Sequence, residues 1–164
     1  MKISKRRQRE SKTDYLKRLN LLKSESPRLI FRKTNRYIIA QYVTSREAQD
    51  KTEIAITSKN LKKYGWPDEF DGSLKSIPAS YLTGFLIGKE IIKKKLKVPI
   101  ADIGMIRTLS KNKVFAFLKG VIDSGIKIKC PDEDFPEEER ISGKNMKKDF
   151  SKIFKEIKSK IEKS

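Results

Sequence analysis

The strongest constraint on this chain is the positive charge concentrated in its first 36 residues. Residues 1–36 contain thirteen Lys or Arg and three Asp or Glu, a net charge of +10, out of +18 for the whole chain of 164 residues. Like charges repel one another, so this segment cannot build a hydrophobic core on its own. We therefore expect it to lie outside the core and to meet an anionic partner, such as phosphate groups.

The residue inventory excludes several kinds of site. The chain has one cysteine, Cys130, and no histidine, which fits a reducing compartment and excludes an intramolecular disulfide, a Cys/His zinc site, a Ser-His-Asp triad and a Cys-His nucleophile. The N-terminus lacks the apolar stretch of a secretory signal, although an Arg-rich organelle-targeting peptide remains an alternative. The longest apolar run, Ile77 to Ile92, is interrupted by charges and is shorter than the roughly 20 residues of a membrane span. We predict no catalytic residue, no metal and no cofactor.

A short helix is predicted after the basic arm. Residues 1–10 are expected to be extended, and Ser11 or Thr13 to cap a helix that runs from Asp14 to Lys23. Its apolar side chains form one stripe, which predicts burial of that stripe: Tyr15, Leu16, Leu19, Leu21 and Leu22. Taken alone, this pattern favours a core position for Tyr15 and Leu16 over a ligand contact.

The middle of the chain predicts a mixed sheet with helices packed on it. Strands are expected at Arg28 to Lys33, Tyr37 to Val43, Thr52 to Thr57, Pro99 to Ile106 and Ile126 to Cys130, with a polar loop from Ser45 to Lys51. Helices are expected from Ser76 to about Leu96, with Gly84 and Gly88 on a face packed closely against the sheet, and from Lys111 to Asp123. The order indicates an α/β fold of the α+β mixed-sheet type, a β-meander followed by βαβ-type crossovers.

The last part of the chain contains an acidic run and an amphipathic helix. Asp132 to Glu139 includes six acids, and it is expected to be a solvated loop that pairs with lysines, because it lacks the spacing of a calcium loop. Apolar residues at steps of three and four predict a helix within Lys144 to Lys163. Its apolar side packs either on its own domain or on RNA or a neighbouring protein, and we favour the second alternative. The predicted divisions are a basic arm and helix (1–26), an α/β core (27–131), and the acidic loop with the C-terminal helix (132–164).

Nucleic-acid binding is the function that the charge distribution favours, with solvated surface charge as the alternative for any single residue. The arm, the first helix and the first hairpin turn supply the cations Lys5, Arg6, Arg7, Arg9, Lys12, Lys17, Arg18, Arg32, Lys33 and Arg36. At the same turn, Asn35 offers a hydrogen-bonding group and Tyr37 a ring, which can contact bases or sugars.

Five stretches resemble a known family. They are R-R-x-R-x-x-K-T-D-Y (Arg6 to Tyr15), PRLIFRKTNRYIIAQ (Pro27 to Gln41), IPASYLTGFLIGK (Ile77 to Lys89), KVFAFLKGVIDSGI (Lys113 to Ile126) and FPEEERISGKNM (Phe135 to Met146). Together they resemble the archaeal and eukaryotic branch of the universal large-subunit ribosomal protein eighteen family. The resemblance implies a non-catalytic, cytoplasmic ribosomal protein that binds 5S rRNA, helps attach it to 23S rRNA in the central protuberance, and neighbours other ribosomal proteins, including another 5S-binding protein.

The resemblance also implies which side chains face RNA. This set is Arg6, Arg7, Arg9, Lys12, Thr13, Tyr15, Arg18, Arg28, Arg32, Asn35 and Arg36. The sequence departs from the family at Tyr37 and Cys130, where relatives often carry histidine, so this chain lacks an imidazole contact at these two positions.

Two other classes of function remain open. The strand order is also that of ribonuclease-H-like sheets, which suggests a metal-dependent nuclease. Such an enzyme needs clustered carboxylates, including one on the first strand, and Arg28 to Lys33 contains none, while Asp102 and Asp123 are the only acids in the later core elements. A basic protein held at anionic membranes is the third possibility, and it predicts liposome binding that RNA does not outcompete.

Overall fold

A four-stranded mixed sheet lies at the centre of the computed structural model, which describes residues 3–47, 49–146 and 149–163. The strand order is β3-β2-β1-β4, and the strands are β1 (Arg28–Lys33), β2 (Ile38–Arg46), β3 (Gln49–Thr57) and β4 (Ile100–Asp102). β1, β2 and β3 pair antiparallel, whereas β4 returns parallel to β1 after a long helix. The mixed α/β fold class, the meander and one βαβ crossover are therefore confirmed.

Four of the predicted strands and one predicted loop differ from the structure. β2 continues to Arg46 and β3 begins at Gln49, so most of the loop expected from Ser45 to Lys51 is strand, and Glu47 forms a turn. This end of the hairpin extends beyond the core. Its side chains are mostly polar, so the sequence there lacks the alternation of apolar and polar residues that predicts a strand. β4 is only three residues long, and Ile126 to Cys130 forms no strand although Ile126 is buried, because no strand of the sheet pairs with it.

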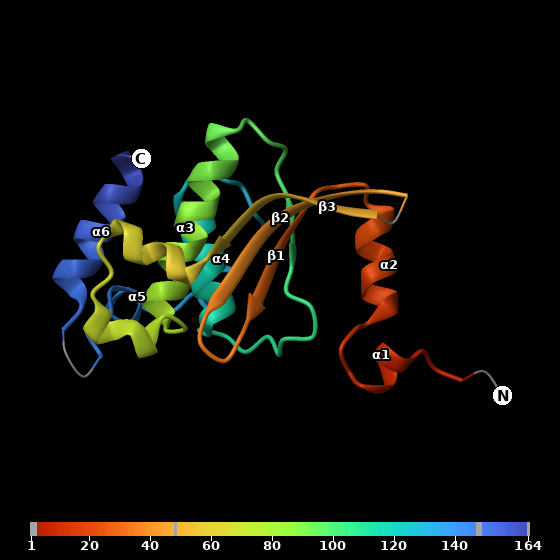
Figure 1. Cartoon of the computed structure of the whole chain (residues 1–164), viewed down its shortest axis with the longest axis horizontal. Helices are drawn as coiled ribbons and strands as arrows, with labels where there is room; N and C mark the ends of the chain where they lie inside the picture. The colour runs from red at the N-terminus through yellow and green to blue at the C-terminus, as the bar shows by residue number, and fades with distance from the viewer. Residues whose placement is uncertain (1–2, 48, 147–148, 164) are drawn as a thin grey trace.

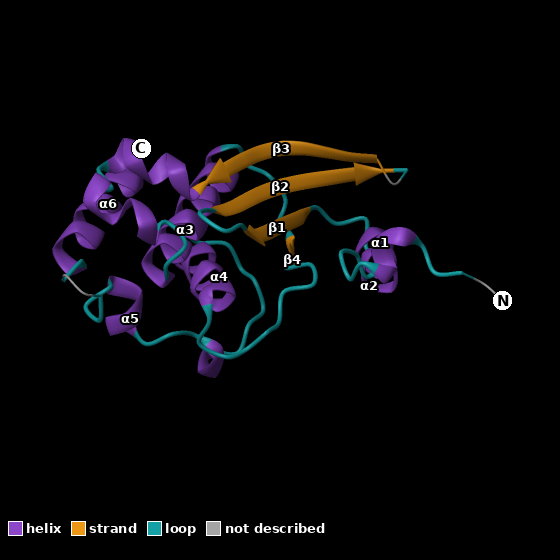
Figure 2. Ribbon diagram, turned by 60° about the horizontal axis from the view of Figure 1, so that its bottom comes forward, coloured by secondary structure: helices purple, strands orange, loops and turns teal. Residues whose placement is uncertain are grey.

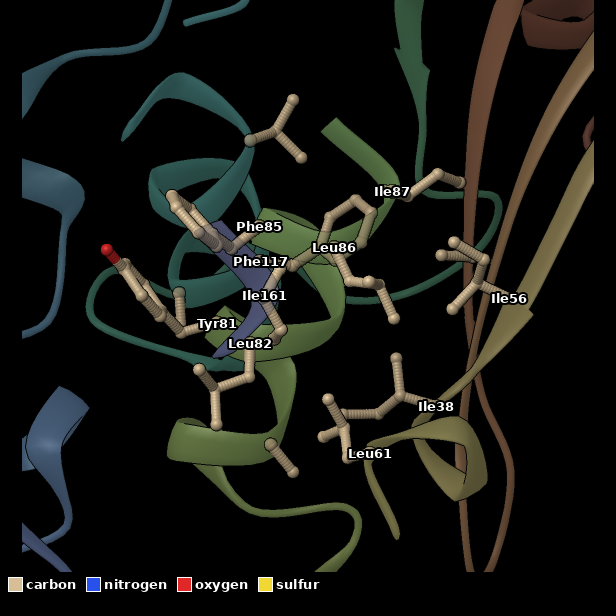
Figure 3. Packing of buried hydrophobic residues seen from close by; sticks show 14 of the residues in the cluster. Ile38, Ile56, Leu61, Tyr81, Leu82, Phe85, Leu86, Ile87, Phe117 and Ile161 are labelled. Atoms are coloured by element: carbon tan, nitrogen blue, oxygen red, sulfur yellow. The ribbon is translucent and has the colours of Figure 1, made fainter. Parts of the chain in front are cut away.

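Two helices, α3 (Ile77–Lys93) and α4 (Lys113–Asp123), cover one face of the sheet (Figures 1 and 2). A third, α6 (Ser151–Lys163), packs on α3 on the side away from the sheet. α3 begins where predicted, because the Ser76 side chain accepts a hydrogen bond from the Ala79 N–H. α4 begins two residues later than the predicted Lys111, because the Asn112 side chain accepts hydrogen bonds from the N–H groups of Val114 and Phe115 and caps the helix there. Figure 3 shows Ile38 and Ile56 of the sheet facing α3, while the rings of Tyr81 and Phe85 lie side by side on another flank of that helix.

The close contact of α3 is with α4, not with the sheet as predicted. A Cβ added at Gly84 would lie less than 3.0 Å from the backbone carbonyl oxygen of Phe117, and one added at Gly120 less than 3.0 Å from that of Tyr81. Gly88 likewise faces the Ser124 side chain. The two helices run parallel, with residue 80 near 113 and residue 88 near 124. Glycine is required because the backbones themselves touch.

The C-terminal helix packs on its own domain, so the expectation that it packs on RNA or a neighbour is wrong. Phe154, Ile157 and Ile161 of α6 are buried, and the Phe154 ring lies 5.4 Å from that of Tyr81 on α3. Just before the helix, the Phe150 ring lies 4.6 Å from that of Trp66. A residue pattern shows that one side of a helix is apolar, but not which surface covers it.

The remaining helical segments are short. They are α1 (Arg6–Arg9), α2 (Tyr15–Lys23), α5 (Glu138–Ser142) and the 3-10 segments η1 (Ser58–Tyr64), η2 (Asp68–Ser73) and η3 (Asp132–Asp134). Both figures place α1 and α2 at the end of the molecule opposite α6. Within the described residues, no helix has the length and apolarity needed to cross a bilayer.

The first two helices correct the prediction for the N-terminal segment. Residues Arg6–Arg9 form a helical turn rather than an extended arm, since the Arg7 carbonyl accepts bonds from the N–H groups of Lys12 and Thr13 and closes the segment. Asp14, not Ser11 or Thr13, caps α2. No residue of α2 is buried, and Leu16 is 70% exposed, so its predicted apolar stripe does not enter the core. α2 instead reaches the rest of the protein through polar side chains.

The close contact between α3 and α4 generates a stability prediction. Gly120→Ala forces a methyl group against the Tyr81 carbonyl, and we expect the free energy of unfolding to fall by about 1–3 kcal/mol, as for other overpacked sites, in urea denaturation. Gly72→Ala is the matched control, because no atom lies within 4 Å of its added methyl group. Equal stability of the two variants would show that the helices can separate at no cost.

Candidate nucleic-acid interface

The predicted RNA-facing residues lie at the two ends of β1. The strand is six residues long, which puts its ends roughly 16 Å apart at about 3.3 Å per residue. Arg28 begins β1 beside the tip of the β2–β3 hairpin, and Lys33 ends it before the turn that carries Asn35 and Arg36. Because strand side chains alternate, Arg28 and Arg32 face one side of the sheet, and Lys33 faces the other side with Phe31. The structure thus divides the predicted set into two groups.

Arg28 is the centre of a chain of ion pairs. Its side chain is 2% exposed, and its Nη2 lies 2.6 Å from Asp50 Oδ1 and 3.0 Å from Ser45 Oγ at the hairpin tip. Its Nη1 lies 3.3 Å from Asp102 Oδ2 on β4. A buried guanidinium needs such partners, because an unpaired charge inside a protein is strongly destabilising. Arg28 therefore joins the hairpin tip to β4.

Arg18 and Arg32 extend this chain at either end. Arg18 of α2 contacts Asp50 Oδ2 at 3.1 Å, and Arg32 contacts Asp102 Oδ1 at 3.0 Å. Arg32 also donates to the backbone carbonyl of Asp102 at 2.8 Å. The side chains of Arg18 and Arg32 remain about two-fifths exposed. Alternating charges thus hold α2, the hairpin, β1 and β4 together and leave both terminal arginines open to a ligand.

The burial of Arg28 corrects one predicted contact. A side chain that is 2% exposed and bonded to two carboxylates does not reach a ligand on the surface. The sequence does not distinguish Arg28 from a surface arginine, because it begins a strand within a basic segment. The structure therefore assigns Arg28 to holding the neighbouring groups in position, apart from the surface that the other arginines share.

The pKa of Asp50 reflects its place between two arginines. Burial raises this pKa, but the hydrogen bonds donated by Ser45 and Arg28, with the charges of Arg28 and Arg18, outweigh the burial. The pKa of Asp50 therefore lies below its ordinary value, and the folded protein favours the ionised carboxylate that joins α2 to β1.

The N-terminal arm, defined as residues 3–14, folds back toward α2. Arg7 Nε donates to Thr13 Oγ1 at 3.0 Å, and Lys5 Nζ lies 4.7 Å from the centre of the Tyr15 ring. The exposed pairs between Glu10 and the cations Arg6 and Lys12 contribute little to stability. No apolar core orders this arm, so its conformation depends on exposed polar contacts.

A crevice of about 140 Å³ separates the arm and α2 from the sheet. Most of the side chains that line it are polar: Arg7, Lys12, Thr13, Asp14, Lys17, Arg18, Arg28, Arg32 and Asp102. Lys17 Nζ reaches across it to the Gly104 carbonyl at 3.3 Å, and Gly104, at a φ of +63°, lies against the Arg32 guanidinium. Exposed Arg6 and Arg9 lie outside the crevice. The surface as a whole presents cations that suit phosphate groups.

The second predicted group surrounds the turn between β1 and β2. Lys33, Asn35 and Arg36 are exposed and Tyr37 is half-buried. Thr34 closes the turn, because its hydroxyl accepts from Tyr37 N at 2.9 Å and donates to the Tyr37 carbonyl. Beside the turn is a hollow of about 360 Å³ lined by Asn35, Arg36, Tyr37, Gly72 and Lys75.

The carboxylates that a nuclease would use have structural partners. Asp102 is held by Arg28 and Arg32, while Asp123 accepts from the Tyr81 hydroxyl at 2.7 Å and pairs with Lys119 at 3.3 Å. Among the described residues, no three metal-ligating side chains gather into a possible ion site. These two acids stabilise the fold.

The acidic segment pairs with lysines, as predicted. Lys111 lies 3.0 Å from Glu137, and Lys144 lies 2.9 Å from Glu139. Asp134 accepts a bond of 2.6 Å from the Ser110 hydroxyl. The segment therefore lies along the loop that precedes α4.

Sequence reasoning missed Asp50 and Lys75 as parts of these surfaces. Asp50 lay in a segment expected to be a loop, and Lys75 is isolated in the sequence. The pairing of β2 with β3 brings Asp50 close to Arg28, and the hollow beside the β1–β2 turn brings Lys75 close to Asn35 and Arg36. Neither residue had a local signal in the sequence.

Comparison with known proteins gives a consistent result. The family described as "Ribosomal large subunit proteins 60S L5, and 50S L18" matches residues 1–98. Proteins named "Large ribosomal subunit protein uL18" are similar over most of the chain. The Korarchaeum cryptofilum protein is 43% identical over 145 residues, 88% of this chain and 72% of its own length. The Methanospirillum hungatei protein is 38% identical over 144 residues, 88% of this chain and 80% of its own.

The place of Asp50 between two arginines predicts a pH dependence. A carboxylate whose pKa is lowered by folding adds stability above its unfolded pKa of about 3.9, and this stability is lost as the pH falls through the folded value. We expect Asp50→Asn to be less stable than the wild type at pH 7, and the difference to shrink below about pH 4. Urea denaturation at pH 7 and pH 3 measures this; a difference that stays constant would remove Asp50 ionisation as the cause.

Proposed function

The chain belongs to the family of large-subunit ribosomal proteins that includes uL18, and we propose that it binds 5S rRNA and helps to attach it to 23S rRNA in the central protuberance. As a family member it is a structural protein of the large ribosomal subunit in the cytoplasm and not an enzyme. The observation that carries the finer proposal is the cationic surface formed by the N-terminal arm, α2 and Arg32 around one crevice.

The composition of this surface favours RNA over other anionic partners. Guanidinium groups form paired hydrogen bonds with phosphate, and the arm carries three of them, on Arg6, Arg7 and Arg9. The crevice is too small for a duplex but admits single phosphate or sugar groups between Arg7, Lys17 and Arg32. Phosphate contacts fix the position of a protein on RNA, which suits a protein whose task is attachment.

We assign the RNA contacts to residues that remain accessible. In the arm and α2 they are Lys5, Arg6, Arg7, Arg9, Lys12, Thr13, Tyr15, Lys17 and Arg18, and on the sheet and turn they are Arg32, Lys33, Asn35, Arg36 and Tyr37. Arg28 supports this set from within. The proposed protein partners are neighbours in the central protuberance, including another 5S-binding protein.

The first test is RNA binding at two salt concentrations. If about 6–10 phosphates are contacted, affinity for purified 5S rRNA is expected to fall by about 10³–10⁵ between 50 and 200 mM salt, because each contact releases counterions. An unrelated RNA of equal length is the control, and it is expected to bind more weakly. A response independent of salt would contradict the electrostatic account. The RNA recovered after incubation with Mg²⁺ is expected to be intact, whereas cleavage would indicate a nuclease.

The second test reverses the charge of the arm. The triple variant Arg6→Glu, Arg7→Glu and Arg9→Glu is expected to lose affinity for 5S rRNA by at least tenfold while its thermal midpoint stays close to that of the wild type, because none of these residues is buried. The matched control reverses Lys152, Lys155 and Lys163, three exposed cations of α6 at the far end of the molecule. Equal losses in the two variants would mean that total charge, not the arm, determines binding.

A further inference from the structure

Three lysines meet at the end of the protein where β1 ends and α3 and α4 begin. Lys33 is the last residue of β1, Lys75 precedes the cap of α3, and Lys113 is the first residue of α4. The parallel course of α3 and α4 brings these starts together, and the Ser80 hydroxyl of α3 donates to the Lys113 carbonyl. We call Lys33, Lys75 and Lys113 the lysine cluster.

The cluster carries positive charge without a compensating acid. Within the described residues, none of the three lysines forms an ion pair, whereas Lys111 nearby is paired with Glu137. Burial, followed by the charges of Lys33 and Lys75, lowers the pKa of Lys113. The acidic segment contacts the loop at Ser110 and Lys111 and leaves the cluster unneutralised. The free protein therefore contains a repulsion that a bound anion would relieve.

The positions of the lysines add to this repulsion. The N-terminal end of a helix carries partial positive charge, and acidic residues are usual there. The first turns of α3 and α4 contain no acid, and Lys75 and Lys113 stand at these ends instead. Neither helix gains stability from these lysines, so the fold itself does not explain why they are there.

Hollows on two sides make the cluster accessible. One, of about 550 Å³, has both cationic and apolar side chains in its lining, among them Lys33, Lys113, Arg107, Arg140, Phe31 and Ile77. The other is the hollow of about 360 Å³ between the β1–β2 turn and Lys75. Together they form a band of cations that runs from the turn to the loop before α4. At the turn, the half-buried ring of Tyr37 offers a surface for a sugar or base beside the phosphates.

We propose that the lysine cluster and its two hollows form a second RNA-binding site, which takes the phosphate backbone of an RNA segment separate from the one held by the N-terminal arm. The proposal rests on the proposed function in that RNA is the ligand. The separation follows from the two faces of β1, because Lys33 faces the side of the sheet opposite to Arg32, which lines the crevice beside the arm. One protein then holds two segments of RNA in a fixed relation.

The test uses the full-length chain with Lys33→Gln, Lys75→Gln and Lys113→Gln combined, measured against purified 5S rRNA over a range of salt. We expect the slope of log affinity against log salt to fall by about 2–3, since each lost phosphate contact removes about 0.9 or less. The control combines Lys152→Gln, Lys155→Gln and Lys163→Gln, which removes the same charge from α6. A slope reduced no more than in this control overturns the proposal.

A stability measurement separates this site from the proposed function. In low salt, inorganic pyrophosphate is expected to raise the thermal midpoint of the wild type and of the α6 control by several degrees, and that of the cluster variant by much less. Equal shifts in all three proteins would overturn the site. If poly-glutamate, but not pyrophosphate, raises the thermal midpoint of the wild type more than that of the cluster variant, the site binds an acidic protein and the RNA proposal is wrong. Failure of the wild type to prefer 5S rRNA over unrelated RNA would refute the proposed function, while the pyrophosphate result would still decide whether the site exists.

Discussion

The neutralisation of one buried guanidinium determines how the N-terminal third of this protein is arranged. Arg28 is enclosed at the start of β1, and its charge requires Asp50 from the hairpin tip and Asp102 from β4. Asp50 in turn holds Arg18, so α2, which buries no side chain of its own, is joined to the sheet through this chain of charges. The accessible cations of the arm are thus held beside Arg32 by a cation that does not itself reach the surface.

The structure shows that residues of one type, close in sequence, have different tasks. Arg28 and Arg32 lie four residues apart on the same face of β1, yet the side chain of Arg28 is buried and that of Arg32 is two-fifths exposed. A count of charges correctly locates the basic segment, and membership of a large-subunit ribosomal family agrees with that charge. It does not separate the cations that meet a partner from those that hold the surface in shape.

Much of the fold was predictable because periodicity records burial. β1, α3, α4 and the helical part of the C-terminal segment follow from apolar spacing, and the start of α3 follows from the cap at Ser76. The prediction failed where a segment is buried but not paired with a strand, or paired but not buried. Ile126 is buried without a partner strand, and the polar hairpin around Asp50 forms strand pairs without being buried. The surface of α3 that receives α6 was also unpredictable, since any apolar surface would satisfy Phe154 and Ile157. For the candidate interface, the cations were visible in the sequence, but the acids that position them were not.

The packing of α6 onto α3 has a consequence for the order of events in the cell. Because Phe154, Ile157 and Ile161 find their partners within the same chain, the hydrophobic core closes without any nucleic acid. The polypeptide can therefore complete its core as soon as translation ends, before it meets any other component of the large ribosomal subunit. Folding of the protein and its incorporation into the subunit need not coincide in time.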